Sequence, residues 1–159
     1  MPGSGKSTIG KALASELGYD FIDLDTNIEA SEGATIQAIF ELKGEAYFRQ
    51  IEALELTRVS EKEGDYIIAS GGGTPCFYSG LALMQKTGKV VFVNVGAEVL
   101  ISRLKSDTQR PLLKEGVEKR IQELEKERIE IYSKAEIIIN ADQLSKQEAI
   151  KLIRKEITI

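Results

Sequence analysis

The chain opens with a glycine-rich turn that leads directly into an amphipathic helix, and this pair constrains the fold more than any other feature. The first eight residues read Met1-Pro2-Gly3-Ser4-Gly5-Lys6-Ser7-Thr8, which matches G-x-x-x-x-G-K-[ST] from its second position onward. Glycines let consecutive backbone N–H groups turn toward one anion, and the following helix presents its positive end to phosphates. Lys6 can reach the β- and γ-phosphates, and the Ser7 hydroxyl can ligate Mg²⁺. The motif therefore predicts that Gly3, Ser4, Gly5, Lys6, Ser7 and Thr8 bind a nucleotide.

Composition removes several classes of protein. With 159 residues, of which 42% are hydrophobic, residues 1–159 fit a single domain with its own core. The chain has no histidine and one cysteine, which excludes Ser-His-Asp triads, histidine metal sites, cysteine zinc clusters and an internal disulfide. The net charge of −4 argues against a nucleic-acid binder, and no apolar run is long enough for a membrane span. We expect a soluble, cytoplasmic protein whose chemistry uses carboxylates, Lys, Arg, hydroxyls and backbone amides.

Apolar runs of strand length alternate with longer amphipathic stretches along the chain. Strands are predicted over 19–24, 66–70, 89–95 and 137–139, and helices over 7–17, 35–43, 45–59, 99–105, 116–132 and 146–157. This alternation predicts an α/β fold with a parallel sheet covered by helices on both faces.

Two groups of residues follow predicted strands. Strand alternation would place Asp23 and Asp25 on one side of the chain, where one could hold Mg²⁺ through water while the other accepts a substrate hydroxyl. Helix capping by these aspartates remains an open alternative. Gly71, Gly72 and Gly73 favour close approach of a ligand to the backbone, with a plain loop as the alternative.

Arginines are the candidate groups for an anionic substrate. Glu45, Arg49 and Glu52 lie at helical spacings and, taken alone, are typical of surface ion pairs. Arg103, Arg110 and Arg128 form a further group, with Arg110 in a polar segment around 105–116 that is expected to act as a mobile lid closing over the γ-phosphate. A solvated charge on a helix is a strong alternative for Arg128.

Taken together, these motifs resemble the shikimate kinase family over essentially the whole chain. In order, they are Gly3-Ser4-Gly5-Lys6-Ser7-Thr8, Asp23-Leu24-Asp25, Gly44-Glu45 with Phe48-Arg49 and Glu52, Gly71-Gly72-Gly73, Arg110-Pro111-Leu112-Leu113, and Arg128 leading to Tyr132. The resemblance implies a transferase: ATP phosphorylates the 3-hydroxyl of shikimate, a step toward chorismate and the aromatic amino acids. It also implies a three-layer α/β/α P-loop kinase fold with strand order 2-3-1-4-5.

The resemblance further implies a role for each candidate residue. Lys6, Asp25 and Arg110 would be catalytic, with Asp25 as the base and Arg110 on the lid. Arg103 and Gln143 would contact adenine, and Ser7 and Asp23 would serve Mg²⁺. Asp25, Arg49, Arg128 and Gly71 to Gly73 would bind shikimate, with the two arginines on its carboxylate. The expected partners are ATP and shikimate, without nucleic acid or membrane, and the expected oligomeric state is a monomer.

The sequence departs from this fold at its start. The family's first strand, which lies at the centre of the sheet, has no counterpart here, so we expect the second and third strands to lack the partner that links them to the fourth. We therefore expect the printed start to be internal to the reading frame, or the chain to be a fragment. Another P-loop kinase, such as a gluconate or nucleoside monophosphate kinase, and a non-catalytic nucleotide-binding protein remain alternatives.

Overall fold

The computed structural model describes residues 1–106 and 116–157. They form two compact units, which are described separately. The terminal unit comprises Met1–Ile9 and Lys89–Ile159, and the middle unit comprises Gly10–Gly88. Helix α1 (Lys6–Leu17) begins in the terminal unit and continues into the middle unit.

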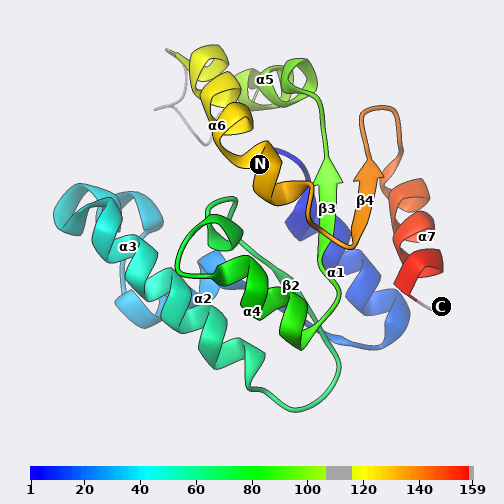
Figure 1. Cartoon of the computed structure of the whole chain (residues 1–159), viewed down its shortest axis with the longest axis horizontal. Helices are drawn as coiled ribbons and strands as arrows, with labels where there is room; N and C mark the ends of the chain where they lie inside the picture. The colour runs from blue at the N-terminus through cyan, green and yellow to red at the C-terminus, as the bar shows by residue number, and fades with distance from the viewer. Residues whose placement is uncertain (107–115, 158–159) are drawn as a thin grey trace. The chain divides into compact units, whose positions relative to one another are not determined.

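The terminal unit is built on a pair of parallel strands (Figure 1). Strand β3 (Val91–Asn94) pairs with β4 (Ile137–Asn140) in the register Val91↔Ile137 to Asn94↔Asn140. Between them in sequence come α5 (Ala97–Ser106) and α6 (Val117–Tyr132), and α7 (Lys146–Ile157) follows β4. Buried aliphatic side chains from these helices and strands form the core: Val93, Leu100, Ile121, Leu124, Ile139, Ile150 and Ile153.

The middle unit repeats the same principle with a second parallel pair. Strand β1 (Asp20–Asp23) leads into α2 (Leu24–Glu32) and α3 (Ile36–Ser60), and β2 (Tyr66–Ala69) is followed by the short 3₁₀ helix η1 (Thr74–Cys76) and α4 (Gly80–Thr87). The strands pair in the register Asp20↔Tyr66 to Asp23↔Ala69. Its core is the apolar cluster of Ile22, Leu24, Ile28, Ile39, Phe48, Leu56 and Val59.

Most predicted elements are present, and two helices were missed. The helix over 146–157 is confirmed at both ends, and the break near Gly44 is confirmed because this residue is non-helical inside α3 (φ 80°, ψ 170°). The strand predicted over 19–24 ends at Asp23, because Leu24 already belongs to α2. Helices α2 and α4 were not predicted as helices.

The strand pairing agrees with the expectation that the second and third strands lack a partner linking them to the fourth. No strand precedes α1 among residues 1–106 and 116–157, and the four strands described there form two separate two-stranded parallel sheets. The predicted α/β class with parallel pairing is confirmed. No helix in the described part of the chain is long and apolar enough to cross a membrane.

A buried carboxylate ties α2 to α3. Glu55 accepts hydrogen bonds from Arg58 Nε at 2.8 Å and Nη2 at 2.6 Å, and from Asn27 Nδ2 at 2.9 Å. The hydrogen-bonded Arg58 guanidinium lowers the pKa of Glu55, against the opposing effect of burial and with a further contribution from Asn27. Because the pKa is lowered in the folded state, this contribution to stability is present above the ordinary glutamate pKa of about 4.3 and is lost as pH falls through the lowered value.

We predict that Glu55→Gln lowers the free energy of unfolding at neutral pH by about 1 kcal/mol, because it removes the charge that Arg58 and Asn27 stabilise. The difference from the parent should shrink toward zero at a second, acidic pH below the lowered pKa of Glu55, where the carboxyl is protonated in both states. Urea unfolding at both pH values measures this, with the exposed Glu63→Gln as control. An equal loss at both pH values would contradict the electrostatic explanation.

Candidate active site

The glycine-rich loop has the backbone conformation that an anion-binding turn requires. Gly3 and Gly5 have positive φ angles of 76° and 83°, which only glycine adopts readily. Helix α1 starts at Lys6, and the Ile9 N–H donates to the Gly5 carbonyl at 2.9 Å. The loop amides and the amino end of α1 thus provide positive electrostatic potential for phosphate groups.

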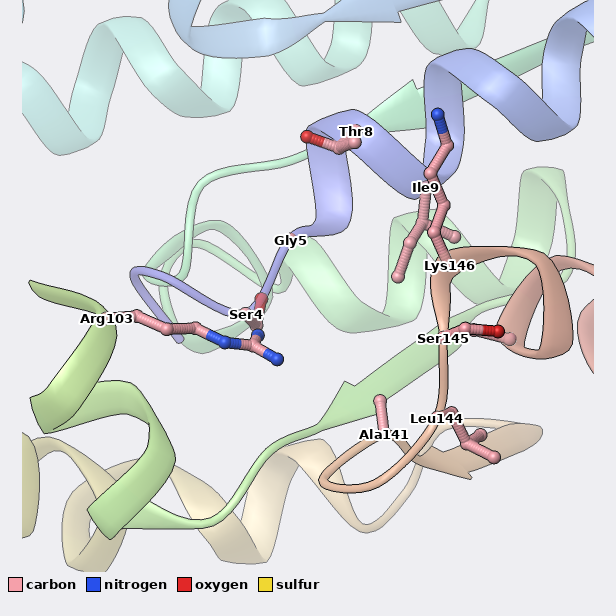
Figure 2. Close-up of a pocket in the computed structure, with 10 residues that line it drawn as sticks. Ser4, Gly5, Thr8, Ile9, Arg103, Ala141, Leu144, Ser145 and Lys146 are labelled. Atoms are coloured by element: carbon pink, nitrogen blue, oxygen red, sulfur yellow. The ribbon is translucent and has the colours of Figure 1, made fainter. Parts of the chain in front are cut away.

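A pocket of about 180 Å³ lies beside this loop in the terminal unit. Its lining combines the loop and α1 with residues from α5 and from the segment after β4: Ser4, Gly5, Thr8, Ile9, Arg103, Ala141, Leu144, Ser145, Lys146 and Ala149. Figure 2 shows Arg103 extending toward Ser4 from one side, with Ala141, Leu144 and Ser145 on another. Arg103 Nη1 donates to the Gly3 carbonyl at 3.3 Å.

The wall formed by the start of α7 was not predicted as part of the site. Ser145 and Glu148 form a capping box: Glu148 Oε2 accepts from the Ser145 backbone N at 2.8 Å and from its hydroxyl at 2.6 Å, and the Glu148 N–H donates back to Ser145 Oγ at 3.3 Å. The hydrogen bonds from the Ser145 hydroxyl and backbone lower the pKa of Glu148. The spacing Ser-x-x-Glu was the sequence signal that could have located this wall.

The predicted nucleotide residues divide into two groups. Ser4, Gly5, Thr8 and Arg103 line the pocket, and Gly3, Lys6 and Ser7 belong to the same loop and helix start without appearing in its lining. Gln143 is exposed and is not among the lining residues. Arg110 and most of the predicted lid at 105–116 lie outside the described residues.

Arg128 is a buried side chain of α6. It is only 9% exposed, so the alternative of a solvated helix charge is wrong. Burial of a guanidinium is costly unless it is paired or serves a ligand, which keeps the predicted binding role open.

The two predicted aspartates lie in different elements of the middle unit. Asp23 is the last residue of β1 and caps α2, because its Oδ1 accepts from the Thr26 N–H at 3.2 Å. Asp25 lies in the first turn of α2, so the argument from strand alternation is wrong, since the helix changes the direction of every side chain after Asp23. The alternative of helix capping is confirmed for Asp23.

Arg49 is the centre of a buried polar cluster on α3. It is 8% exposed, and its Nη1 donates to Glu52 Oε2 at 2.8 Å. Glu45 Oε1 accepts from Arg49 Nε at 3.2 Å and from Nη2 at 3.1 Å. Because Glu52 is only 2% exposed, the alternative of surface ion pairs, which the spacing alone favours, is wrong for the Arg49–Glu52 pair; in the pair with Glu45, only the glutamate is exposed.

The triple glycine accommodates this cluster. A Cβ at Gly71 would lie 2.6 Å from Glu52 Oε1 and 3.2 Å from Asp25 Oδ1, and a Cβ at Gly73 would collide with the Arg49 guanidinium. Neither Gly71 nor Gly73 has a positive φ angle. At both positions the space that a Cβ would need is occupied by side chains of this chain, whereas the backbone conformation does not favour glycine. The parallel register explains why Asp25 lies close to Gly71. Asp23 pairs with Ala69, so the residues that follow both strands leave the same edge of the sheet.

Residues after the triple glycine complete the surroundings of Arg49. The Thr74 hydroxyl donates to Glu52 Oε1 at 2.7 Å, so both oxygens of the buried carboxylate are hydrogen-bonded. The Phe77 ring centroid lies 4.6 Å from Arg49 Cζ, and that of Phe48 lies 5.2 Å away. Glu52, Thr74 and Phe77 were not predicted as site residues. The i, i+3 spacing of Arg49 and Glu52 was visible in the sequence, but Thr74 and Phe77 gave no signal.

The described residues hold no group of three or more His, Cys, Asp or Glu side chains placed for a metal ion. The oxygen donors predicted for Mg²⁺ are the Ser7 hydroxyl and the Asp23 carboxylate. The helix cap uses Oδ1 of Asp23. A hydroxyl and a carboxylate suit Mg²⁺, which retains several waters and needs few protein ligands when phosphates are present.

Comparisons with known proteins agree on one family. The family model for shikimate kinase (SKI) matches residues 2–158. A shikimate kinase of Sulfurihydrogenibium sp. is 42% identical over 155 residues, covering 98% of this chain and 92% of the relative. The crystal structure of shikimate kinase from Bacteroides thetaiotaomicron is similar with a TM-score of 0.92 and 36% identity, covering 99% of this chain and 94% of the other. The structure of the Acinetobacter baumannii enzyme in complex with shikimate has a TM-score of 0.91 and 33% identity, covering 98% and 88%.

We predict that Gly73→Ala lowers the free energy of unfolding by about 1–3 kcal/mol, because its methyl group forces the buried Arg49 guanidinium away from Glu52. Alanine fits the backbone at this position (φ −86°, ψ −25°), so the effect is steric. Gly88→Ala is the control, since a Cβ at Gly88 meets nothing within 4 Å. Equal stability of the two variants in urea unfolding would show that the packing around Arg49 is looser than the structure indicates.

Proposed function

The chain belongs to the shikimate kinase family, and we propose that its glycine-rich loop holds ATP while the Arg49 cluster and Asp25 receive shikimate. The family and the function predicted from the sequence are confirmed: the chain is an ATP-dependent kinase that transfers the γ-phosphate to the 3-hydroxyl of shikimate. The predicted P-loop kinase fold is confirmed as well. The residue assignments below are proposals.

Residues of the terminal unit make the proposed contacts with ATP. The amides of Gly3, Ser4 and Gly5, together with the side chains of Lys6, Ser7 and Thr8, hold the phosphates, and the positive φ angles of the two glycines support this role. Arg103 binds the adenine end of ATP, which its position in the pocket lining supports, and Gln143 approaches the base from the loop after β4. Arg110 stabilises the charge on the γ-phosphoryl group during transfer.

Mg²⁺ fits the donor oxygens of this chain. Ser7 would hold the ion directly and Asp23 through water. When bound, Mg²⁺ neutralises phosphate charge during phosphoryl transfer. Independently of the ion, Lys6 and the loop amides bind the phosphates and orient the γ-phosphoryl group.

Residues of the middle unit make most of the proposed contacts with shikimate. Arg49 binds the shikimate carboxylate, and the observation that carries this assignment is its buried guanidinium, fixed by Glu52 and packed against Gly73. Arg128, also buried, is the second carboxylate ligand. Gly71, Gly72 and Gly73 bind the substrate through their backbone.

Asp25 is the proposed general base. It accepts the proton of the 3-hydroxyl as that oxygen attacks the γ-phosphorus, and the bond from γ-phosphorus to the bridging oxygen of ADP breaks. Its Oδ1 near Gly71 supports this assignment, because the same glycine is a proposed substrate contact. The monomeric state and the cytoplasmic location remain predictions from the sequence.

We predict that ADP release by the full chain with ATP and Mg²⁺ depends on shikimate and not on gluconate. Gluconate is also a hydroxylated carboxylate, so it controls for recognition of a carboxylate alone. The measurement is coupled-assay turnover with each acceptor at equal concentration. Turnover with gluconate at a comparable rate would contradict the substrate assignment.

We predict that Asp25→Asn lowers kcat about 100-fold or more, because the amide cannot accept the hydroxyl proton. The affinity for ATP, measured by equilibrium titration, should remain within about twofold of the parent, since Asp25 has no role toward the nucleotide. Asp20→Asn is the matched control, because Asp20 is an exposed aspartate at the start of β1. If Asp25→Asn retained parental kcat, Asp25 would not be the base.

A further inference from the structure

Two carboxylates are hydrogen-bonded to the Arg49 guanidinium, and a third lies near one of them. Arg49 is hydrogen-bonded to both Glu45 and Glu52, and Asp25 lies on the Gly71 side of Glu52. These four side chains bring together three carboxylates and one guanidinium. A substrate carboxylate binding to Arg49 would meet this negative charge, and repulsion between like charges at short range weakens such binding.

The two glutamates on Arg49 differ in their freedom to move. Glu52 is held at both oxygens, by Arg49 Nη1 at 2.8 Å and by the Thr74 hydroxyl at 2.7 Å, and its side chain is 2% exposed. Glu45 accepts through a single oxygen, Oε1, and its side chain is 55% exposed. Glu45 can therefore turn into water at small cost, whereas moving Glu52 would leave a buried charge without a partner.

Glu45 also occupies the edge of Arg49 that suits a carboxylate. The Nε and Nη2 N–H groups of a guanidinium point in parallel and match the two oxygens of a carboxylate. In this structure both donate to Glu45, at 3.2 and 3.1 Å. The Phe77 and Phe48 rings lie against the guanidinium, and Glu52 takes Nη1, so an incoming carboxylate competes with Glu45 for the remaining edge.

We propose that Glu45 is a displaceable counter-ion that covers the Nε and Nη2 edge of Arg49 in the free enzyme and yields this position to the carboxylate of shikimate. Glu45 then sets substrate affinity without taking part in phosphoryl transfer. This inference rests on the proposed role of Arg49 as a carboxylate ligand. It makes Glu45 a positioning and affinity-determining residue, because it acts on the substrate through Arg49.

The test is Glu45→Gln, with Glu41→Gln as the matched control. Glu41 is an exposed glutamate four residues earlier in the sequence, on the other side of the break at Gly44, and it is hydrogen-bonded by Gln37 at 2.8 Å. Its variant therefore removes the same charge without removing a hydrogen bond to Arg49. Glu45→Gln should tighten shikimate binding to the free enzyme about two- to tenfold and lower the KM for shikimate similarly, since an exposed ion pair and its repulsion are removed. The kcat and the KM for ATP should remain at parental values, and Glu41→Gln should change none of these constants by more than about 1.5-fold.

Two further arms make the outcome unambiguous. Glu45→Ala, which removes the hydrogen bond together with the charge, should show the same gain, whereas the methyl ester of shikimate, which lacks the carboxylate charge, should show no gain with either variant. An unchanged or raised Kd for shikimate in Glu45→Gln, or an equal gain in Glu41→Gln, would overturn the proposal.

Arg49→Lys separately tests the assignment of Arg49 as a ligand of the shikimate carboxylate. If it weakens shikimate binding tenfold or more while Glu45→Gln has no effect, the role of Arg49 stands and that of Glu45 falls; if Arg49→Lys has no effect, the role proposed for Arg49 falls first.

Discussion

A buried guanidinium must have its N–H groups paired, and this requirement at Arg49 organises much of the middle unit. Removing a charge from water costs several kcal/mol unless partners replace the lost hydration. Glu52 supplies the buried partner, Thr74 holds the other oxygen of that carboxylate, and Gly73 leaves room for the guanidinium. One charged side chain thus determines the residue types at three other positions on two segments of the chain.

Parallel pairing of β1 and β2 brings those segments together. Because Asp23 pairs with Ala69, the residues after both strands leave the same edge of the sheet, and Asp25 comes close to Gly71. The glycines of the phosphate-binding loop and those of the triple-glycine segment serve different purposes. Gly3 and Gly5 adopt positive φ angles, whereas Gly71 and Gly73 do not; at the latter two, packed side chains fill the space that a Cβ would need.

The sequence predicted the elements whose signals are local and missed those that depend on distant contacts. Helix α7 and the break at Gly44 followed from periodicity and from a residue that favours non-helical angles. The strand over 19–24 was extended too far, because Leu24 and Asp25 continue an apolar and polar alternation that fits a strand as well as the first turn of a helix. Helix α4 was missed because it follows Tyr78 and Ser79, whose positive φ angles could not be expected from their residue types. The motifs located Arg49 and Asp25, but Thr74 and Phe77 reach Arg49 only through the folded path of the loop.

The two carboxylates that are bonded to Arg49 differ in their burial and not in their sequence spacing. In the sequence, Glu45 at i−4 and Glu52 at i+3 are equivalent partners for a helical arginine, and both would be assigned the small energy of surface pairs. In the structure, Glu52 is enclosed and bonded at both oxygens, so it fixes the guanidinium, while Glu45 remains largely in water, so it can exchange with another anion. A protein with a net charge of −4 can therefore recognise an organic acid. Under the proposed roles, one cation is held by the buried carboxylate of Glu52 and is covered by the exposed carboxylate of Glu45, which can turn into water.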